Sequence, residues 1–244
     1  MSKNARRKTD SLRAATGRPA SPRTWRLLRR LQQFESRNVT YCDPRGGWPI
    51  FWDRARGAHV WDAEGRRYLD LTAAFGVMAA GHGNPAVVRA AQRQLGLLVH
   101  AMGDVHPHAR KADLARELSR ITFERWTAGG STVRAKTLFG NSGFEAVEAA
   151  LKTAMLATGR PGVVAFAGGY HGLGYGALNA THRAMFREPF RPQLGQFGVH
   201  VPFPAHNDDL ERVERQVRQL LEQRRIGAIL VEPVQGRGGI RVPP

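Results

Sequence analysis

Cysteine is almost absent from this chain of 244 residues, in which Cys42 stands alone. One cysteine excludes a disulfide within the chain and a cysteine-rich zinc site, and it suits a reducing compartment. Long hydrophobic runs are missing too, since no stretch approaches the ~18 apolar residues of a membrane-spanning helix. No apolar signal core lies near the N-terminus. With 42 % hydrophobic residues, the composition predicts a globular, cytoplasmic protein.

Acidic residues are scarce, with 20 Asp and Glu against 37 Lys and Arg and a formal net charge of +17. More than half of this excess falls within residues 1–40. We interpret residues 1–23 as a basic, disordered tail. Arginine outnumbers lysine 32 to 5, which is typical of a GC-rich genome. Nucleic-acid binding through the tail and an organellar presequence are the alternatives, and nucleic acid is not the partner we expect.

The region 24–108 has the pattern of a small α+β segment. Apolar residues at helical spacing over 25–34 predict a short helix. The stretch 59–70 is typical of two short strands joined by a turn. A glycine-rich stretch follows over 74–83, and Pro85 then predicts the first turn of another helix.

The pattern changes over 109–244, where short apolar strands alternate with helices. The expected strands are 136–140, 162–166, 198–202 and 227–232, and the expected helices are 109–123, 143–158 closed by Gly159, and one capped by Asn207. This alternation predicts an α/β domain with a mostly parallel sheet that helices cover on both faces. Such sheets bind ligands beyond the carboxyl ends of their strands, so the residues that follow strands are the candidates for chemistry.

The first such stretch is 139–152, where a strand enters a turn of small residues and a helix leaves it. Backbone N–H groups at a helix start lack partners, and the helix dipole favours an anion there. Ser142 adds a hydroxyl donor and Gly143 permits a close approach, which together indicate a phosphate site. The alternative is an ordinary helix with a common Ser cap. We expect Glu148 and Lys152, four residues apart, to pair on the helix surface.

The second stretch is 168–172, just after the expected strand 162–166. Tyr170 is followed by His171 and flanked by glycines. Its ring is suited to stacking on a planar heteroaromatic ligand held by the neighbouring phosphate site. A glycine-rich loop with a packed tyrosine is an equally good interpretation of the same residues.

The third stretch is 231–239, in which Glu232 follows a buried strand that Pro233 ends. We expect the carboxylate of Glu232 to point toward the ligand crevice, where its burial is costly unless it is hydrogen-bonded or paired. The alternative is a loop that happens to contain one acid. The Gly-Arg-Gly-Gly sequence within this stretch is weak evidence for RNA binding, because it occurs once.

In this order and spacing, the three stretches resemble the class-III aminotransferases, the group of ornithine, acetylornithine and 4-aminobutyrate transaminases. The segment 68–85 resembles the N-terminal segment of that family, so the resemblance covers 34–244. It implies the fold type I of transferases that depend on pyridoxal phosphate (PLP), with a homodimer as the assembly. The implied reaction passes an amino group from an amine or amino acid to PLP and then to a keto acid. An aminomutase of the same fold is a lesser alternative.

The resemblance also implies residue roles. The implied cofactor-binding residues are Ser142, Gly143, Phe144, Tyr170, His171 and Glu232. The first three would bind the PLP phosphate, Tyr170 would stack on the pyridine ring with His171 beside it, and Glu232 would lie near the cofactor. Phe75 matches a position that lines the substrate pocket of the neighbouring subunit in relatives. No metal ligand is implied.

Two residues depart from the family pattern. Phe144 replaces the small residue that usually follows the Ser-Gly pair, so a large ring must find room beside the phosphate site. Arg237 stands where several relatives have a glutamate that pairs with a substrate-binding arginine. The second departure disfavours an ornithine-like or 4-aminobutyrate-like substrate.

The family's chemistry also needs a lysine that holds PLP as a Schiff base. In relatives this lysine lies well beyond the Glu-Pro-Val-Gln-Gly stretch. The lysines of this chain are Lys3, Lys8, Lys111, Lys136 and Lys152, and none matches that position. We therefore assign no catalytic residue and expect the chain by itself to be an inactive N-terminal half of such an enzyme. A non-catalytic remnant that binds PLP or a partner is the alternative.

Overall fold

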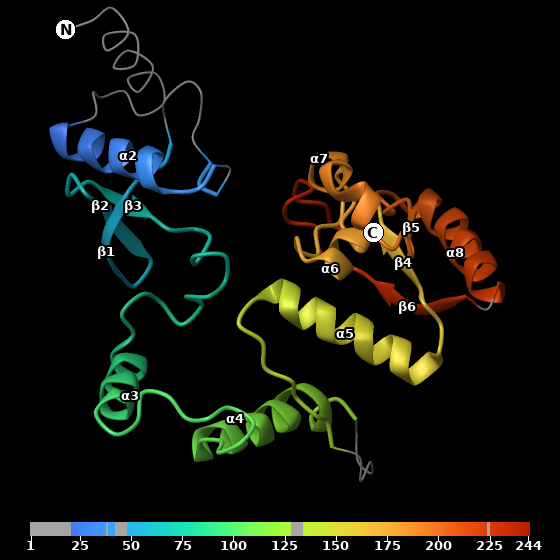
Figure 1. Ribbon diagram of the computed structural model, residues 1–244, viewed down its shortest axis with the longest axis horizontal. Coiled ribbons are helices and arrows are strands. Elements are labelled where there is room, and N and C mark those ends of the chain that lie inside the picture. The colour runs from blue at the N-terminus through green and yellow to red at the C-terminus, as the bar shows by residue number, and fades with distance from the viewer. Residues whose placement is uncertain (1–20, 38, 42–47, 128–133, 224) are drawn as a thin grey trace, which may run out of the picture. The chain divides into compact units, whose positions relative to one another are not determined.

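The computed structural model describes residues 21–37, 39–41, 48–127, 134–223 and 225–244. The expected tail over 1–20 and Cys42 lie outside these described residues. The chain divides into two compact units, Met1–His108 and Ala109–Pro244 (Figure 1). No helix in the described part has the length and apolar character required to cross a membrane. The described residues also contain no group of three His, Cys, Asp or Glu suited to a metal ion.

The first unit begins with helix α2 (Pro22–Phe34), which confirms the helix expected from 25–34 and extends it by nearly one turn. The Oγ of Ser21 caps the helix by accepting hydrogen bonds from the N–H groups of Arg23 (3.1 Å) and Thr24 (3.4 Å). Helix α2 thus begins inside the segment 1–23 that we interpreted as a tail. Pro22 suits the first helical position because its missing N–H is not needed there.

An antiparallel sheet follows α2, formed by β1 (Trp52–Arg56), β2 (His59–Asp62) and β3 (Arg67–Leu69) in that order. Strands β2 and β3 confirm the expected hairpin. Strand β1 was not predicted, because its sequence is mostly charged and four of its five residues are exposed. Helix α3 (Pro85–Leu95) begins where expected.

The sheet of the second unit consists of β4 (Gly162–Phe166), β5 (Gly198–Val201) and β6 (Ile226–Leu230). Strand β4 lies in the middle and pairs in parallel with both neighbours, so the parallel sheet is confirmed. The strand expected over 136–140 is wrong, since 134–141 contains no strand. A strand needs a partner's ladder, and among the described strands none pairs with this segment.

Helices cover both faces of this sheet, as expected. The helices that pack on the sheet are α5 (Gly143–Thr158), α6 (Tyr175–Ala180) and α8 (Asn207–Glu222). The second unit also contains α4 (Ala109–Ser119) with the π-helical turn Arg120–Glu124, and α7 (Ala184–Arg187) with the 3-10 turn Glu188–Gln193. Val164 of β4 packs on Val213 of α8 in the core. Val163 points to the opposite face, where α5 lies beside β6 (Figure 1). The cap of α8 is His206 and not Asn207, which is the first helical residue.

Candidate functional site

The N-terminus of α5 is open to solvent. Ser142 is its cap, with an extended backbone, and the Oγ of Ser142 accepts a hydrogen bond from the N–H of Glu145 (3.4 Å). The N–H groups of Gly143 and Phe144 have no partner within the helix. A Cβ added at Gly143 would meet no atom within 4 Å. The helix start therefore offers hydrogen-bond donors, a favourable dipole and room for an anion.

Phe144 finds its room against the loop that follows β4. A Cβ added at Gly172 would collide with the Cβ of Phe144, and one added at Gly174 would lie 2.7 Å from Cδ2 of the ring. Gly172 also has a φ of 114°, which side chains rarely adopt. These glycines let the first turn of α5 lie directly on the loop that carries Tyr170.

Tyr170 lies between the loops that follow two neighbouring strands. Its N–H donates a hydrogen bond to Oε2 of Glu232 (2.9 Å), so the loops after β4 and β6 are joined. Its ring packs edge-on against Phe186, with ring centroids 5.6 Å apart. The guanidinium carbon of Arg237 lies 4.8 Å from the centroid of the Tyr170 ring. Tyr170 and Glu232 therefore meet at the carboxyl edge of the sheet.

His171 points into the interior of the loop. It is 8 % exposed, and its Nε2 has no hydrogen-bond partner among the described residues. Its backbone N–H donates to Oγ1 of Thr181 (3.0 Å), and that hydroxyl donates to the carbonyl of Gly172 (3.0 Å). Burial lowers the pKa of His171 from its usual 6.5, and the charge of Glu232 opposes part of this shift. A neutral imidazole at pH 7 follows.

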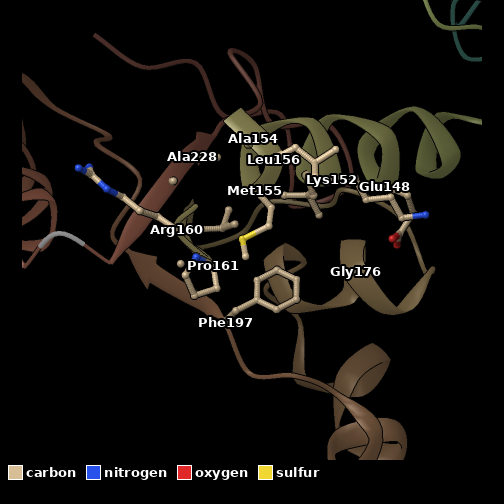
Figure 2. A pocket seen from close by; sticks show the side chains of 14 residues that line it. Glu148, Lys152, Ala154, Met155, Leu156, Arg160, Pro161, Gly176, Phe197 and Ala228 are labelled. Carbon is tan, nitrogen blue, oxygen red and sulfur yellow. The ribbon is translucent and has the colours of Figure 1, made fainter. Parts of the chain in front are cut away.

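Glu148 has a different partner from the one its sequence indicates. Its Oε1 accepts a hydrogen bond from the N–H of Ala177 in α6 (2.8 Å). In the described residues no ion pair joins it to Lys152, so the expected pairing is wrong. A desolvated backbone N–H is a better partner than an exposed ammonium that water already solvates. Figure 2 shows the carboxylate of Glu148 directed toward Gly176.

Gln235 is a residue to which the sequence assigned no role. Its side chain is fully buried, and its Nε2 donates to the carbonyl of Ala167 (2.8 Å). Its backbone N–H and carbonyl both bond to Arg241. This arrangement fixes the loop after β6 against the loop after β4. The burial of Gln235 depends on contacts 68 residues apart, so no local pattern indicates it.

A cavity of about 570 Å³ lies between α5 and the sheet (Figure 2). Its walls are mainly apolar, with Leu151 and Met155 from α5, Val163 from β4 and Phe197 before β5. None of the expected cofactor-binding residues lines it. The candidate site at the carboxyl edge of the sheet is therefore distinct from this cavity.

Phe75 lies in the first unit, and its side chain is 99 % exposed. Its φ is +59°, and Ala73 and Ala74 are also left-handed. The carboxylate of Asp70 holds this turn, because it accepts hydrogen bonds from the N–H of Ala74 (3.0 Å) and from Nε2 of His82 (2.8 Å). Phe75 thus belongs to a different unit from the other expected site residues.

Asp70 makes the stability of the first unit depend on pH in the acid range. The hydrogen bond from His82, followed by those from Thr72, lowers the pKa of Asp70 from 3.8 to about 2. A lowered carboxyl pKa in the folded state stabilises the fold above the unfolded-state pKa, and this contribution is lost as the pH falls toward about 2. Asp70→Asn should therefore lower the urea midpoint near neutral pH and flatten its fall in acid. The exposed Asp104→Asn is the control, and superimposable profiles for Asp70→Asn and wild type would contradict the assignment.

Comparison with known proteins identifies the family. The model of the class-III aminotransferases matches residues 41–244. The chain is 38 % identical over 196 residues to an acetylornithine aminotransferase of Methanopyrus kandleri, covering 80 % of the chain and 46 % of that protein. It is 35 % identical over 225 residues to a 5-aminovalerate aminotransferase of Pseudomonas aeruginosa, covering 88 % of the chain and 49 % of that protein. The chain thus spans about half the length of these relatives.

Solved structures give the same answer. An amine transaminase from an uncultivated Pseudomonas species, in its PLP-bound form, matches with a TM-score of 0.73 and 27 % identity, covering 87 % of this chain and 50 % of that one. An omega-transaminase from Thermomicrobium roseum matches with a TM-score of 0.75 and 26 % identity, covering 90 % and 52 %. The α/β fold expected from the sequence, fold type I of the PLP-dependent transferases, is confirmed. The chain belongs to the class-III aminotransferase family.

Proposed function

We propose that this chain forms the phosphate-binding and ring-binding side of the PLP site in a transaminase. The reaction transfers an amino group from an amine or amino acid to a keto acid. One observation supports this most strongly: the open N-terminus of α5 lies against the loop that carries Tyr170, through the contact of Phe144 with Gly172 and Gly174. Hydrogen-bond donors for a phosphate and an aromatic ring are thereby adjacent. A small ligand that carries both a phosphate and a planar ring requires this arrangement.

The residues present fit PLP. Ser142 offers a hydroxyl, Gly143 and Phe144 offer backbone N–H groups, and the space at Gly143 is empty of side chains. The half-buried ring of Tyr170 supplies an aromatic surface on the same edge of the sheet. When bound, PLP supplies the electron sink for transamination.

The chain's own residues would bind and orient this group. Ser142, Gly143 and Phe144 would hold the phosphate, and Tyr170 would restrict the plane of the pyridine ring. Glu232 would hold the backbone of Tyr170 in place, with the neutral His171 packed inside the same loop. Phe75 keeps its proposed role beside the substrate pocket of a partner subunit in a homodimer.

The proposed substrates are an amine or amino acid and a keto acid. Arg237 carries a positive charge where several relatives have a glutamate, and it lies over the rings of Tyr170 and Phe186. We therefore do not propose an ornithine-like or 4-aminobutyrate-like donor. A cytoplasmic location is part of the same proposal.

The second candidate function, for this chain by itself, is binding of PLP without a covalent bond. Lys152 lines the apolar cavity and Lys111 lies in α4, and no lysine matches the family's catalytic position. Equilibrium dialysis with PLP should show saturable binding that inorganic phosphate displaces, and borohydride treatment should add no cofactor mass to a lysine. Binding that phosphate does not displace would contradict the phosphate site. Amino transfer to 2-oxoglutarate by the chain alone would contradict the non-covalent mode.

A further inference from the structure

Glu148 lies on the same face of α5 as Phe144, four residues earlier. Both side chains contact the segment that links the Tyr170 loop to α6. A Cβ added at Gly174 would lie 2.7 Å from Oε1 of Glu148, and one added at Gly176 would collide with Oε2. The carboxylate therefore occupies the space that side chains at these positions would fill.

The start of α6 lacks a capping hydrogen bond from its own residues. The residue at the cap position is Gly174, which has no side chain to accept one. Oε1 of Glu148 instead accepts a hydrogen bond from the N–H of Ala177 (2.8 Å), and Ala177 is fully buried. Glu148 of α5 thus pairs with the buried N–H of Ala177, which has no partner within α6. A buried donor without a partner is destabilising.

Besides the bonds of Thr181, two carboxylates hold the segment from Tyr170 to Ala177. Glu232 binds the N–H of Tyr170 from the β6 side, and Glu148 binds the N–H of Ala177 from α5. Only the second bond connects the segment to the helix whose N-terminus forms the proposed phosphate site. The position of the Tyr170 ring relative to that helix therefore depends on this bond of Glu148, together with the contact of Phe144 with Gly172 and Gly174.

We infer that Glu148 is a positioning residue that sets the spacing between the phosphate-binding start of α5 and the ring of Tyr170. The inference rests on the proposed function. In PLP a single CH2–O linkage joins the phosphate to the ring and limits the distance between them, so both contacts must be satisfied together. Inorganic phosphate uses the start of α5 alone and does not sense this spacing.

The test compares PLP and inorganic phosphate on variants of the full chain. Glu148→Ala should weaken PLP binding about tenfold and change phosphate affinity less than about twofold. Glu148→Gln keeps an oxygen acceptor at the same reach and should restore PLP binding to within about threefold of wild type. The induced circular dichroism of bound PLP, which reports ring orientation, should change in Glu148→Ala and recover in Glu148→Gln.

Lys152→Ala is the matched control, since it removes the neighbour on the same helix and should leave all readouts unchanged. If Glu148→Ala does not fold, Glu148→Asp keeps the charge and shortens the reach, and the same loss of PLP affinity is expected. Wild-type PLP affinity in Glu148→Ala or Glu148→Asp would overturn the inference, as would equal losses of PLP and phosphate. Failure of the wild-type chain to bind PLP would instead refute the proposed function.

Discussion

Gly143→Asp is expected to weaken PLP binding on the order of 100-fold while leaving the fold at least as stable. The new carboxylate would lie among the N–H groups that we assign to the phosphate. There it would compete for these donors and repel the phosphate, which should cost about 3 kcal/mol of PLP binding free energy. The fold should not suffer, because a Cβ at Gly143 meets no atom within 4 Å and Gly143 does not have a positive φ. An acid in a first helical turn is itself stabilising by about 0.3–1 kcal/mol.

The opposite signs of these two effects make this substitution informative. Gly143→Ala adds a Cβ in the same open space without adding charge, so it should stabilise the helix slightly and weaken PLP binding much less than Gly143→Asp does. Thermal unfolding measures stability, and equilibrium dialysis measures affinity for PLP. Undiminished PLP binding by Gly143→Asp would show that the phosphate does not bind at the start of α5.

Tyr170→Ala has the second-largest expected effect, a loss of PLP affinity of roughly tenfold or more, because an aromatic stacking contact contributes about 1–3 kcal/mol. Inorganic phosphate should bind this variant as it binds wild type, since phosphate has no ring to stack. Competition between PLP and phosphate in equilibrium dialysis measures both affinities.

Tyr170→Phe is the matched control for the ring. It keeps the aromatic face and the backbone N–H that Glu232 accepts, so PLP affinity should stay within about threefold of wild type, because the ring contributes most of the contact. A loss in Tyr170→Phe as large as in Tyr170→Ala would assign the effect to the phenol hydroxyl and contradict stacking.

The sequence predicts local elements well where the determining contacts are local. Ser142 and Gly159 mark both ends of α5 correctly, because a cap and a left-handed glycine act within a few residues. The strand expected at 136–140 fails for the opposite reason. Its ladder would need a partner strand from elsewhere in the chain, and none of the described strands provides one.

The candidate site could be predicted as a set of loops but not as a set of contacts. Parallel strands place their carboxyl ends on one edge, so the loops that carry Tyr170 and Glu232 are both candidates for the ligand crevice. The bond between them joins residues 62 positions apart. Helical spacing predicts that Glu148 pairs with Lys152, whereas its partner is the backbone N–H of Ala177, 29 residues away. A backbone N–H carries no sequence signal, so only the structure reveals this contact.

A crystal structure of the chain with PLP tests the central claim most directly. We expect the phosphate within hydrogen-bond distance of Ser142 Oγ and the N–H groups of Gly143 and Phe144, with the pyridine ring on Tyr170. Density for PLP in the apolar cavity between α5 and the sheet (Figure 2), with the start of α5 empty, would contradict the account.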